Sequence, residues 1–290
     1  MSNLKQLRNR VKSIKSTQKI TKAMHIVSAA KLKKVKDQAE NLNNFSHTLG
    51  LVMHDIATSG NLMDLPDNDR KFFNDELEKL PQLLVVMTSE RGLCGSFNSN
   101  ILKKVKVDIK NLEKSGKQFK LLIIGRKGRD TLKVDYADKI IGNYHVSHGN
   151  YECVSREVKD KIIELVEHEE AGACNIYYNK FVNAMTQIAS VEQMLSAQTS
   201  EISTENQITH YEYEGTGLVH DVINLYIHGE INYALLQNRA SEEGARMTAM
   251  DNSTKNAKEL INKFTLKLNR SRQAIITTEL TEIISGAEAI

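Results

Sequence analysis

Apolar residues recur at every third or fourth position through the first part of the chain. The pattern starts at Leu4 and, after a polar interval at Gln18 and Thr21, resumes at Leu32. This spacing places the side chains on one face of a helix, as in the seam of a coiled coil. We therefore predict a helix within residues 1–60, roughly 80 Å long at about 1.5 Å per residue. The seam residues are Leu4, Leu7, Val11, Ile14, Gln18, Thr21, Leu32, Val35, Ala39, Leu42, Leu49, Met53 and Ile56.

The same spacing returns near the C-terminus and continues from Val219 to Glu282, with Gly229 and Glu243 as its main interruptions. A sustained seven-residue repeat predicts a left-handed supercoil. Two such segments in one chain most simply pair with each other, antiparallel. Beyond Leu268 the seam becomes small and polar, so we expect the second helix to extend past its partner, with Gly286 as a possible cap.

Between the two helical segments the pattern changes to short apolar runs. The runs LLVVM (83–87) and FKLLII (119–124) are bounded by turns that contain glycine, which is typical of buried parallel strands. Amphipathic helices are indicated from Leu102 to Leu112 and from Val158 to Leu165. The alternation predicts a small α/β domain. Later strands are predicted at 175–181 and 186–195, and the whole chain divides into a helix at 1–60, the α/β domain at 70–200 and a helix at 210–290.

Positive charge is concentrated at the N-terminus. Residues 1–36 contain eleven Lys and Arg and no acid, so the rest of this +3 chain carries a net charge of −8. Six of these cations follow helical steps one position beyond the seam, and we call them the basic stripe. A solvated face normally mixes both signs, so we predict an acidic partner, with a purely solvated face as the alternative. The basic stripe consists of Lys5, Arg8, Lys12, Lys15, Lys19 and Lys22.

Composition narrows the class of protein. Two prolines and no tryptophan among 290 residues favour long helices over a loop-rich enzyme. Three cysteines without CxxC spacing favour a reduced compartment over a disulfide framework. No apolar run approaches the roughly 20 residues that span a bilayer, and the polar start MSNLKQLRNR does not resemble a signal peptide. We expect a soluble chain, or one attached to a membrane only through partners.

Two glycine-containing stretches are the candidates for chemistry. SERGLCGSFN (89–98) and IIGRKGRD (123–130) lie where a nucleophile or an anion could bind, yet neither contains GxxxxGK[ST], GxGxxG or GxSxG. We interpret both as tight turns at strand ends. His145 and His148 are interpreted as surface histidines because no convincing further ligand accompanies them. No catalytic residue, metal site or cofactor site is therefore predicted.

Four segments resemble the gamma subunit of F-type ATP synthases. They are STQKITKAMHIVSAAKLKK (16–34), TSERGLCGSFN (88–98), ASEEGARMTAMDNSTKNAKELI (240–261) and RQAIITTELTEIISGA (272–287), in the order of the family. The resemblance covers essentially the whole chain. It implies a fold of the class α/β plus a long antiparallel coiled coil: the two terminal helices pair, and a Rossmann-like α/β domain packs at the lower part of the pair.

The resemblance also implies a mechanical function. In this family, proton flow turns a membrane ring of c subunits, and gamma is the asymmetric shaft that changes the nucleotide affinities of the alpha and beta subunits. The implied partners are alpha, beta, epsilon and the c ring, with no nucleic acid and no insertion into the membrane. The C-terminal helix is expected inside the alpha and beta hexamer, where isoleucines suit a sliding contact because apolar burial is non-directional.

The matched motifs imply contacts with the hexamer. Met24, in ITKAMHIV, matches the position that faces an acidic segment of beta, and two lysines of the basic stripe lie nearby. His25 follows where the family often has Glu, so a charge near this contact differs or depends on pH. For Arg246, in EGARMTAM, the alternative is an ordinary solvated arginine. The expected hexamer contacts are Lys19, Lys22, Met24, Arg246, Arg272, Gln273, Thr277 and Glu279.

A second set of contacts is implied in the segment YEYEG (211–215), which resembles the foot of the family's shaft. Tyr211, Tyr213 and Glu214 are expected to touch the c ring and epsilon, with an edge strand as the alternative. The absence of paired cysteines and of an Arg-rich presequence favours the bacterial type, with a processed mitochondrial chain as the alternative. The expected location is peripheral, on the cytoplasmic face of the bacterial inner membrane.

Two rival classes remain open. A nucleic-acid-binding coiled coil would explain the basic stripe, although its second heptad segment would normally follow the basic region directly. An enzyme built on the α/β domain is the other rival. Steep salt dependence of DNA binding would favour the first, and saturable nucleotide binding by the isolated chain would favour the second.

Overall fold

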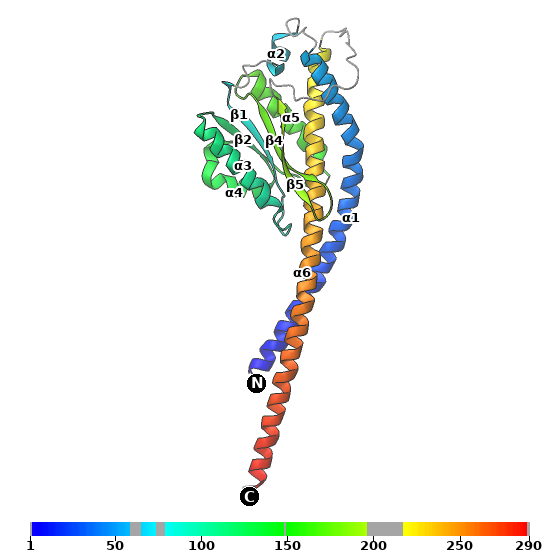
Figure 1. Cartoon of the computed structure of the whole chain (residues 1–290), viewed down its shortest axis with the longest axis vertical. Helices are drawn as coiled ribbons and strands as arrows, with labels where there is room; N and C mark the ends of the chain where they lie inside the picture. Colours follow the sequence, from blue (N-terminus) through cyan, green and yellow to red (C-terminus); the bar gives the residue numbers. More distant parts are fainter. Residues whose placement is uncertain (1, 59–64, 74–78, 148, 196–216, 289–290) are drawn as a thin grey trace. The chain divides into compact units, whose positions relative to one another are not determined.

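The computed structural model describes residues 2–58, 65–73, 79–147, 149–195 and 217–288 (Figure 1). The chain divides into two compact units. We call Met1–Ala29 with Arg246–Ile290 the helical unit, and Ala30–Ala245 the sheet unit. The helices α1 (Ser2–Thr58) and α6 (Leu218–Glu288) contribute residues to both units. No helix in the described ranges is both long enough and apolar enough to cross a membrane.

The two long helices predicted from the heptad pattern are confirmed by α1 and α6. The prediction of a cap at Gly286 is wrong, because α6 runs through this residue to Glu288. Gly286 keeps a helical backbone and is absent from the glycines with positive φ. The residues that follow it, Ala287 and Glu288, are good helix formers and do not favour termination.

In the helical unit the two helices pair antiparallel. Thr21 of α1 lies against Thr254 of α6, with their hydroxyl oxygens 2.7 Å apart. Closer to the N-terminus, the guanidinium of Arg10 lies 5.1 Å from the ring centroid of Phe264, a cation–π contact. An earlier residue of α1 thus meets a later residue of α6, as the antiparallel prediction requires.

In the sheet unit α1 and α6 also pair antiparallel. Val35 and Ala39 of α1 form an apolar cluster with Leu236 and Ala240 of α6. Further along α1, the hydroxyl of Ser46 donates a hydrogen bond to the carboxylate of Glu230. These positions follow the predicted seams, because three-four spacing keeps one face of each helix turned to the other.

The two interruptions of the α6 seam have separate physical reasons. At Gly229 a Cβ atom would lie 3.4 Å from Cδ1 of Leu49 and 3.7 Å from the Phe45 ring, which is van der Waals contact, so two large side chains of α1 cover this seam position. At Glu243 the carboxylate is buried and pairs with the Arg239 guanidinium at 2.7 Å. A heptad pattern cannot anticipate either neighbour.

The sheet unit contains a five-stranded sheet in the order β3-β2-β1-β4-β5. The first four strands are parallel, and β5 pairs antiparallel with β4. The strands predicted at 83–87, 119–124, 175–181 and 186–195 are all present, whereas β3 was not predicted. The strands are β1 (Gln82–Met87), β2 (Phe119–Ile124), β3 (Ile140–Tyr144), β4 (Cys174–Phe181) and β5 (Gln187–Leu195).

Helices cover both faces of this sheet (Figure 1). Apolar residues of α3 (Phe97–Lys114) and α4 (Arg126–Tyr136) pack on one face, around Val86 and Ile123. On the other face, α5 (Tyr151–Glu167) and the start of α6 pack with the last turns of α1. Shorter elements are α2 (Asp67–Arg70) and the 3₁₀ turns η2 (Lys71–Phe73) and η4 (Ala137–Lys139).

Candidate partner-binding surfaces

The loop that joins β2 to α4 is a tight structural turn. Gly125 has φ 103°, and a Cβ atom there would lie 2.2 Å from the carbonyl oxygen of Thr88. The Thr88 hydroxyl accepts a hydrogen bond from the backbone N–H of Gly128 at 2.8 Å. One N-terminal donor of α4 is therefore used within the chain, which supports the interpretation of IIGRKGRD as a strand-end turn.

The loop that follows β1 is also held by internal hydrogen bonds. Asn98 accepts from the backbone N–H of Ser89 at 3.0 Å and donates to the Ser89 hydroxyl at 2.8 Å. Cys94 is 2% exposed and packs with Phe97 and Ala245. Leu93 has φ 66°, a left-handed conformation that is unusual for leucine, and its side chain is exposed. Ser89 and Cys94 are thus structural groups.

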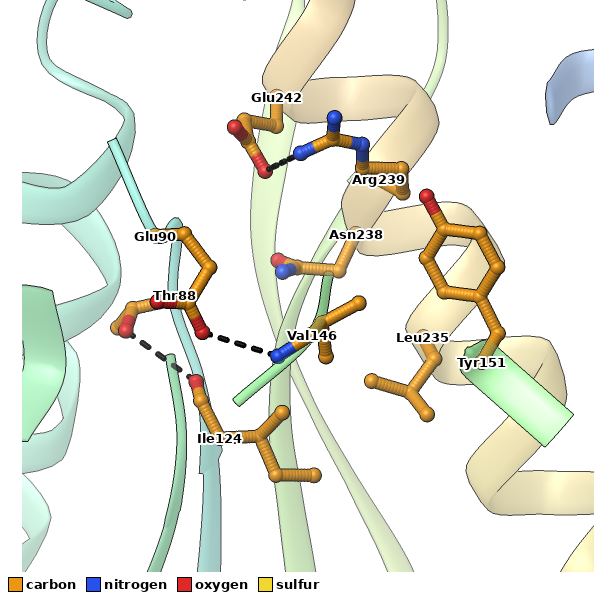
Figure 2. Close-up of a pocket in the computed structure, with 9 residues that line it drawn as sticks. All are labelled: Thr88, Glu90, Ile124, Val146, Tyr151, Leu235, Asn238, Arg239 and Glu242. Atoms are coloured by element: carbon orange, nitrogen blue, oxygen red, sulfur yellow. Dashed lines mark hydrogen bonds and ion pairs between the residues drawn. The ribbon is translucent and has the colours of Figure 1, made fainter. Parts of the chain in front are cut away.

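A cavity lies at the carboxyl edge of the parallel strands, between the sheet and α6 (Figure 2). In doubly wound folds this edge is the usual ligand site. Here the cavity volume is only about 10 Å³, room for roughly one water molecule. The cavity is therefore too small for a nucleotide. Its lining residues are Thr88, Glu90, Ile124, Val146, Tyr151, Leu235, Asn238, Arg239 and Glu242.

The charges beside the cavity neutralise one another in part. Arg239 pairs with Glu242 at 2.8 Å and with Glu243 at 2.7 Å, and all three side chains are largely buried. Burial lowers the pKa of Arg239, but the two carboxylates outweigh this effect and raise it. Glu90 accepts from the backbone N–H of Val146 at 3.0 Å and lies 3.3 Å from His145.

One cluster has the residue types of a hydrolase but not the geometry. The Ser155 hydroxyl lies 2.9 Å from Nε2 of His228, and a Glu152 carboxylate oxygen lies 3.4 Å from the same nitrogen. In a catalytic triad the carboxylate holds the opposite ring nitrogen. Ser155 is also fully buried. This cluster therefore joins α5 to α6 and does not present a nucleophile to solvent.

The basic stripe is solvent-exposed along its whole length in the helical unit. Met24 and His25 are half-buried. Exposed apolar side chains accompany the stripe: Ile20 is 60% exposed, Ile26 59% and Val27 52%. These three were not among the predicted contacts, although their position between basic residues and outside the seam could have identified them. The result is a basic surface that includes unpaired apolar side chains.

The last turns of α6 are similarly exposed. Side chains of the seam remain half-buried as far as Ile275, and the described side chains from Ile276 onward are exposed. This agrees with the prediction that α6 extends beyond its partner helix. Exposed apolar residues here are Ile276, Leu280, Ile283 and Ile284, and the predicted contacts Arg272, Gln273, Thr277 and Glu279 are exposed as well.

Arg246 differs from the other predicted contacts because it is only 7% exposed. The alternative of an ordinary solvated arginine is therefore wrong. Near His25, the pKa of the Asp251 carboxyl is lowered by a hydrogen bond from Lys255 and, to a smaller extent, by the charge of His25. Tyr211, Tyr213, Glu214 and His148 lie outside the described residues.

The buried polar groups of the sheet unit and the exposed surfaces of the helical unit together indicate a class of protein. The groups that resemble catalytic ones hold the sheet unit together, while the predicted hexamer contacts all belong to the helical unit and seven of the eight are exposed or half-buried there. A paired-helix subunit that binds other chains fits this arrangement.

Comparison with known proteins identifies the family. The family model described as ATP synthase matches residues 3–290. The chain is 53% identical over 290 residues to the ATP synthase gamma chain of Rickettsia akari (strain Hartford), and 51% identical to that of Rickettsia bellii (strain RML369-C). Each alignment covers 100% of both chains. The chain therefore belongs to the ATP synthase gamma chain family, whose members are non-catalytic rotor subunits.

Solved structures agree on the fold. A chain of the Euglena gracilis mitochondrial ATP synthase, OSCP/F1/c-ring, matches with a TM-score of 0.68 and 19% identity, over 99% of this chain and 94% of that one. A chain of the Tetrahymena thermophila mitochondrial ATP synthase, central stalk/c-ring, matches with a TM-score of 0.53 and 25% identity, over 80% and 98%. The predicted fold class and family are thus confirmed.

Proposed function

We propose that this chain is the central rotor shaft of a proton-translocating F-type ATP synthase. It couples rotation of the membrane c ring to conformational change in the alpha and beta hexamer, where ATP is made or hydrolysed. Family membership supports this function, and so does the exposure of the basic stripe and of residues 272–287 of α6, which we call the α6 tip. A coupling element acts only through differential contacts with alternative states of its partners.

Two surfaces of the helical unit are proposed to touch the hexamer. Lys19 and Lys22, together with the neighbouring apolar residues of α1, would bind acidic segments of beta. At the α6 tip, the exposed apolar side chains would act as a bearing, because apolar contacts are non-directional. Arg272 and Gln273 would make directional hydrogen bonds to beta, and we call these two residues the catch. Thr277 and Glu279 would support the catch.

Three further assignments belong to this proposal. Arg246 is buried and would position the contact from within the helix pair, whereas Met24 would meet beta directly. Tyr211, Tyr213 and Glu214 would meet the c ring and epsilon. The complex would place the chain at the cytoplasmic face of the bacterial inner membrane, held there by its partners.

Co-purification tests the assignment most directly. The chain with an affinity tag should retain alpha, beta and epsilon at fewer copies of itself than of alpha or beta, and the complex should hydrolyse ATP. The purified chain alone should neither bind ATP tightly nor hydrolyse it, since the cavity at the carboxyl edge of the sheet is too small for a nucleotide. Turnover that follows this chain alone through successive columns would contradict the proposal, and so would recovery without alpha and beta.

A further inference from the structure

Strand β4 continues beyond its neighbour β1. The two strands pair only as far as Val86 and Tyr177, so the backbone from Asn179 to Phe181 has no strand on that side. On its other side the same segment is paired with β5. Buried N–H and C=O groups at a strand edge are costly unless other groups satisfy them.

Side chains of α6 take the place of the missing strand. Asn238 Oδ1 accepts a hydrogen bond from the backbone N–H of Asn179 at 3.1 Å, and the Ser241 hydroxyl donates to the carbonyl oxygen of Asn179 at 2.7 Å. Gln237 Oε1 accepts from the backbone N–H of Phe181 at 3.2 Å. Asn179, Asn238 and Ser241 are 1%, 5% and 0% exposed, so water does not compete for the two bonds at Asn179.

The opposite face of the same turns of α6 is apolar. Leu236 and Ala240 pack against α1, as described above. Apolar contacts alone do not fix how far a helix is rotated about its axis or shifted along it, because they are non-directional. Hydrogen bonds require both distance and angle. The bonds to β4 therefore fix the rotation of α6 about its own axis relative to the sheet.

A glycine allows this close approach. At Gly244, one turn beyond Ser241, a Cβ atom would lie 3.1 Å from the Phe181 ring and 3.5 Å from Cα of Ala184. The contact between α6 and the end of β4 thus continues over two turns of the helix. It consists of hydrogen bonds at Asn179 and of close packing of Gly244 against Phe181.

We propose that Gln237, Asn238 and Ser241 form a lock that prevents α6 from turning against the α/β domain and so passes torque between the domain and the helix pair. They are positioning residues, and their mechanical role rests on the proposed rotor function. The lock itself is a property of the isolated chain, so it can be tested separately from rotation.

Three variants of the full-length chain test the lock. Asn238→Leu removes the acceptor for the Asn179 amide at nearly constant volume, whereas Asn238→Asp keeps an oxygen acceptor. The matched control is Asn232→Leu, since the Asn232 side chain has only a 3.3 Å bond to the exposed Glu152. Hydrogen exchange at Asn179 should be about tenfold faster in Asn238→Leu, as expected for one lost hydrogen bond. It should be unchanged in Asn232→Leu and less affected in Asn238→Asp, which keeps the oxygen acceptor but buries a carboxylate.

The same variants in the assembled complex test the transfer of torque. Asn238→Leu should lower ATP-driven proton pumping per ATP hydrolysed, while Asn238→Asp and Asn232→Leu should not. Unchanged exchange at Asn179, or faster exchange with normal pumping per ATP, would overturn the proposal. If Asn238→Leu fails to fold, Gln237→Leu gives the same reading at the Phe181 amide, whose N–H loses its acceptor. Failure of the wild-type chain to assemble with alpha and beta would instead count against the rotor function.

Discussion

Thr21 and Thr254 place their hydroxyl oxygens 2.7 Å apart within the seam of the antiparallel helix pair. Each hydroxyl is also within reach of a carbonyl of its own helix, that of Gln18 at 3.1 Å and that of Met250 at 2.8 Å. The two hydroxyls meet in only one register, because any slip separates the two residues. The pair therefore aligns α1 with α6 at a cost in apolar burial.

This alignment gives a prediction for a double-mutant cycle. Thr21→Val and Thr254→Val should each lower the free energy of unfolding by about 0.5–1.5 kcal/mol, because each removes the hydrogen bond between the two hydroxyls. The double variant should lose less than the sum, since two valines restore an apolar seam. Urea unfolding followed by circular dichroism measures all four proteins. Strict additivity would show that the two hydroxyls are not coupled.

Much of the fold follows from local patterns, and the exceptions are instructive. The seams predict α1 and α6 because three-four spacing is a property of each helix alone. Strand β3 was missed because only Ile140 and Ile141 precede Gly142 and Asn143, and every residue of it is half-buried. It is a strand through its pairing with β2, which no local pattern reveals.

Contacts with other chains, and polar contacts within this one, are harder to predict from local sequence patterns. The exposure of Arg272 is typical of any solvated helix, so only the family resemblance predicts it as a contact. Lys19 is predicted as a contact also by the single sign of the basic stripe. The burial of Arg246 and the bonds from Asn238 to β4 depend on neighbours distant in the sequence. Sequence therefore predicts the shaft well and its internal polar contacts poorly.

Glu230 should make the stability of the sheet unit depend on pH. Burial and the nearby Glu192 raise its pKa above the ordinary value of 4.5, and the hydrogen bond from Ser46 only partly opposes them. A carboxyl with a raised pKa in the folded state stabilises the fold below 4.5 and loses this contribution as pH rises through the raised value. Glu230→Gln should remove that dependence. The gain in unfolding free energy relative to wild type should therefore be larger at pH 8 than at pH 5.

The control for this prediction is Glu192→Gln, because Ser46 donates its hydrogen bond to Glu230 and not to Glu192. It should lower the pKa of Glu230 by removing the like charge, and so shift the pH dependence without abolishing it. Denaturant titrations at the two pH values, on the isolated chain, decide the matter. Equal gains at both pH values would contradict the assignment to Glu230.

Removal of Arg239 should be strongly destabilising. Its loss leaves the carboxylates of Glu242 and Glu243, which are 4% and 2% exposed, without that cation. We expect Arg239→Met to cost about 3–5 kcal/mol in unfolding free energy at neutral pH. Arg156→Met, at an arginine whose side chain is 65% exposed, should change stability by less than about 1 kcal/mol.

Charge reversal in the basic stripe should affect coupling more than folding. Lys19 and Lys22 are exposed and outside the seam, so Lys19→Glu with Lys22→Glu should leave the helix pair intact. The double variant should nevertheless lower proton pumping relative to ATP hydrolysis, through repulsion from acidic segments of beta. The control reverses Lys110 and Lys114, two exposed lysines of α3 in the sheet unit. Normal pumping relative to hydrolysis in the first variant would mean that the stripe is only a solvated face.

Two variants of the α6 tip should distinguish a sliding apolar contact from a directional hydrogen-bonded one. Deletion from Ala287 onward removes a short part of the apolar bearing, and the exposed apolar residues from Ile276 to Ile284 remain. Assembly and substantial activity should therefore survive this truncation. Replacing Arg272 and Gln273 together by leucine should cost more activity per residue changed, since buried partners on beta would lose hydrogen bonds worth about 1–3 kcal/mol each. Both variants are compared in complexes of equal subunit content, assayed for hydrolysis and pumping. A truncation far more damaging than the Arg272 and Gln273 replacement would show that the residues from Ala287 onward, and not Arg272 and Gln273, carry the specific contact.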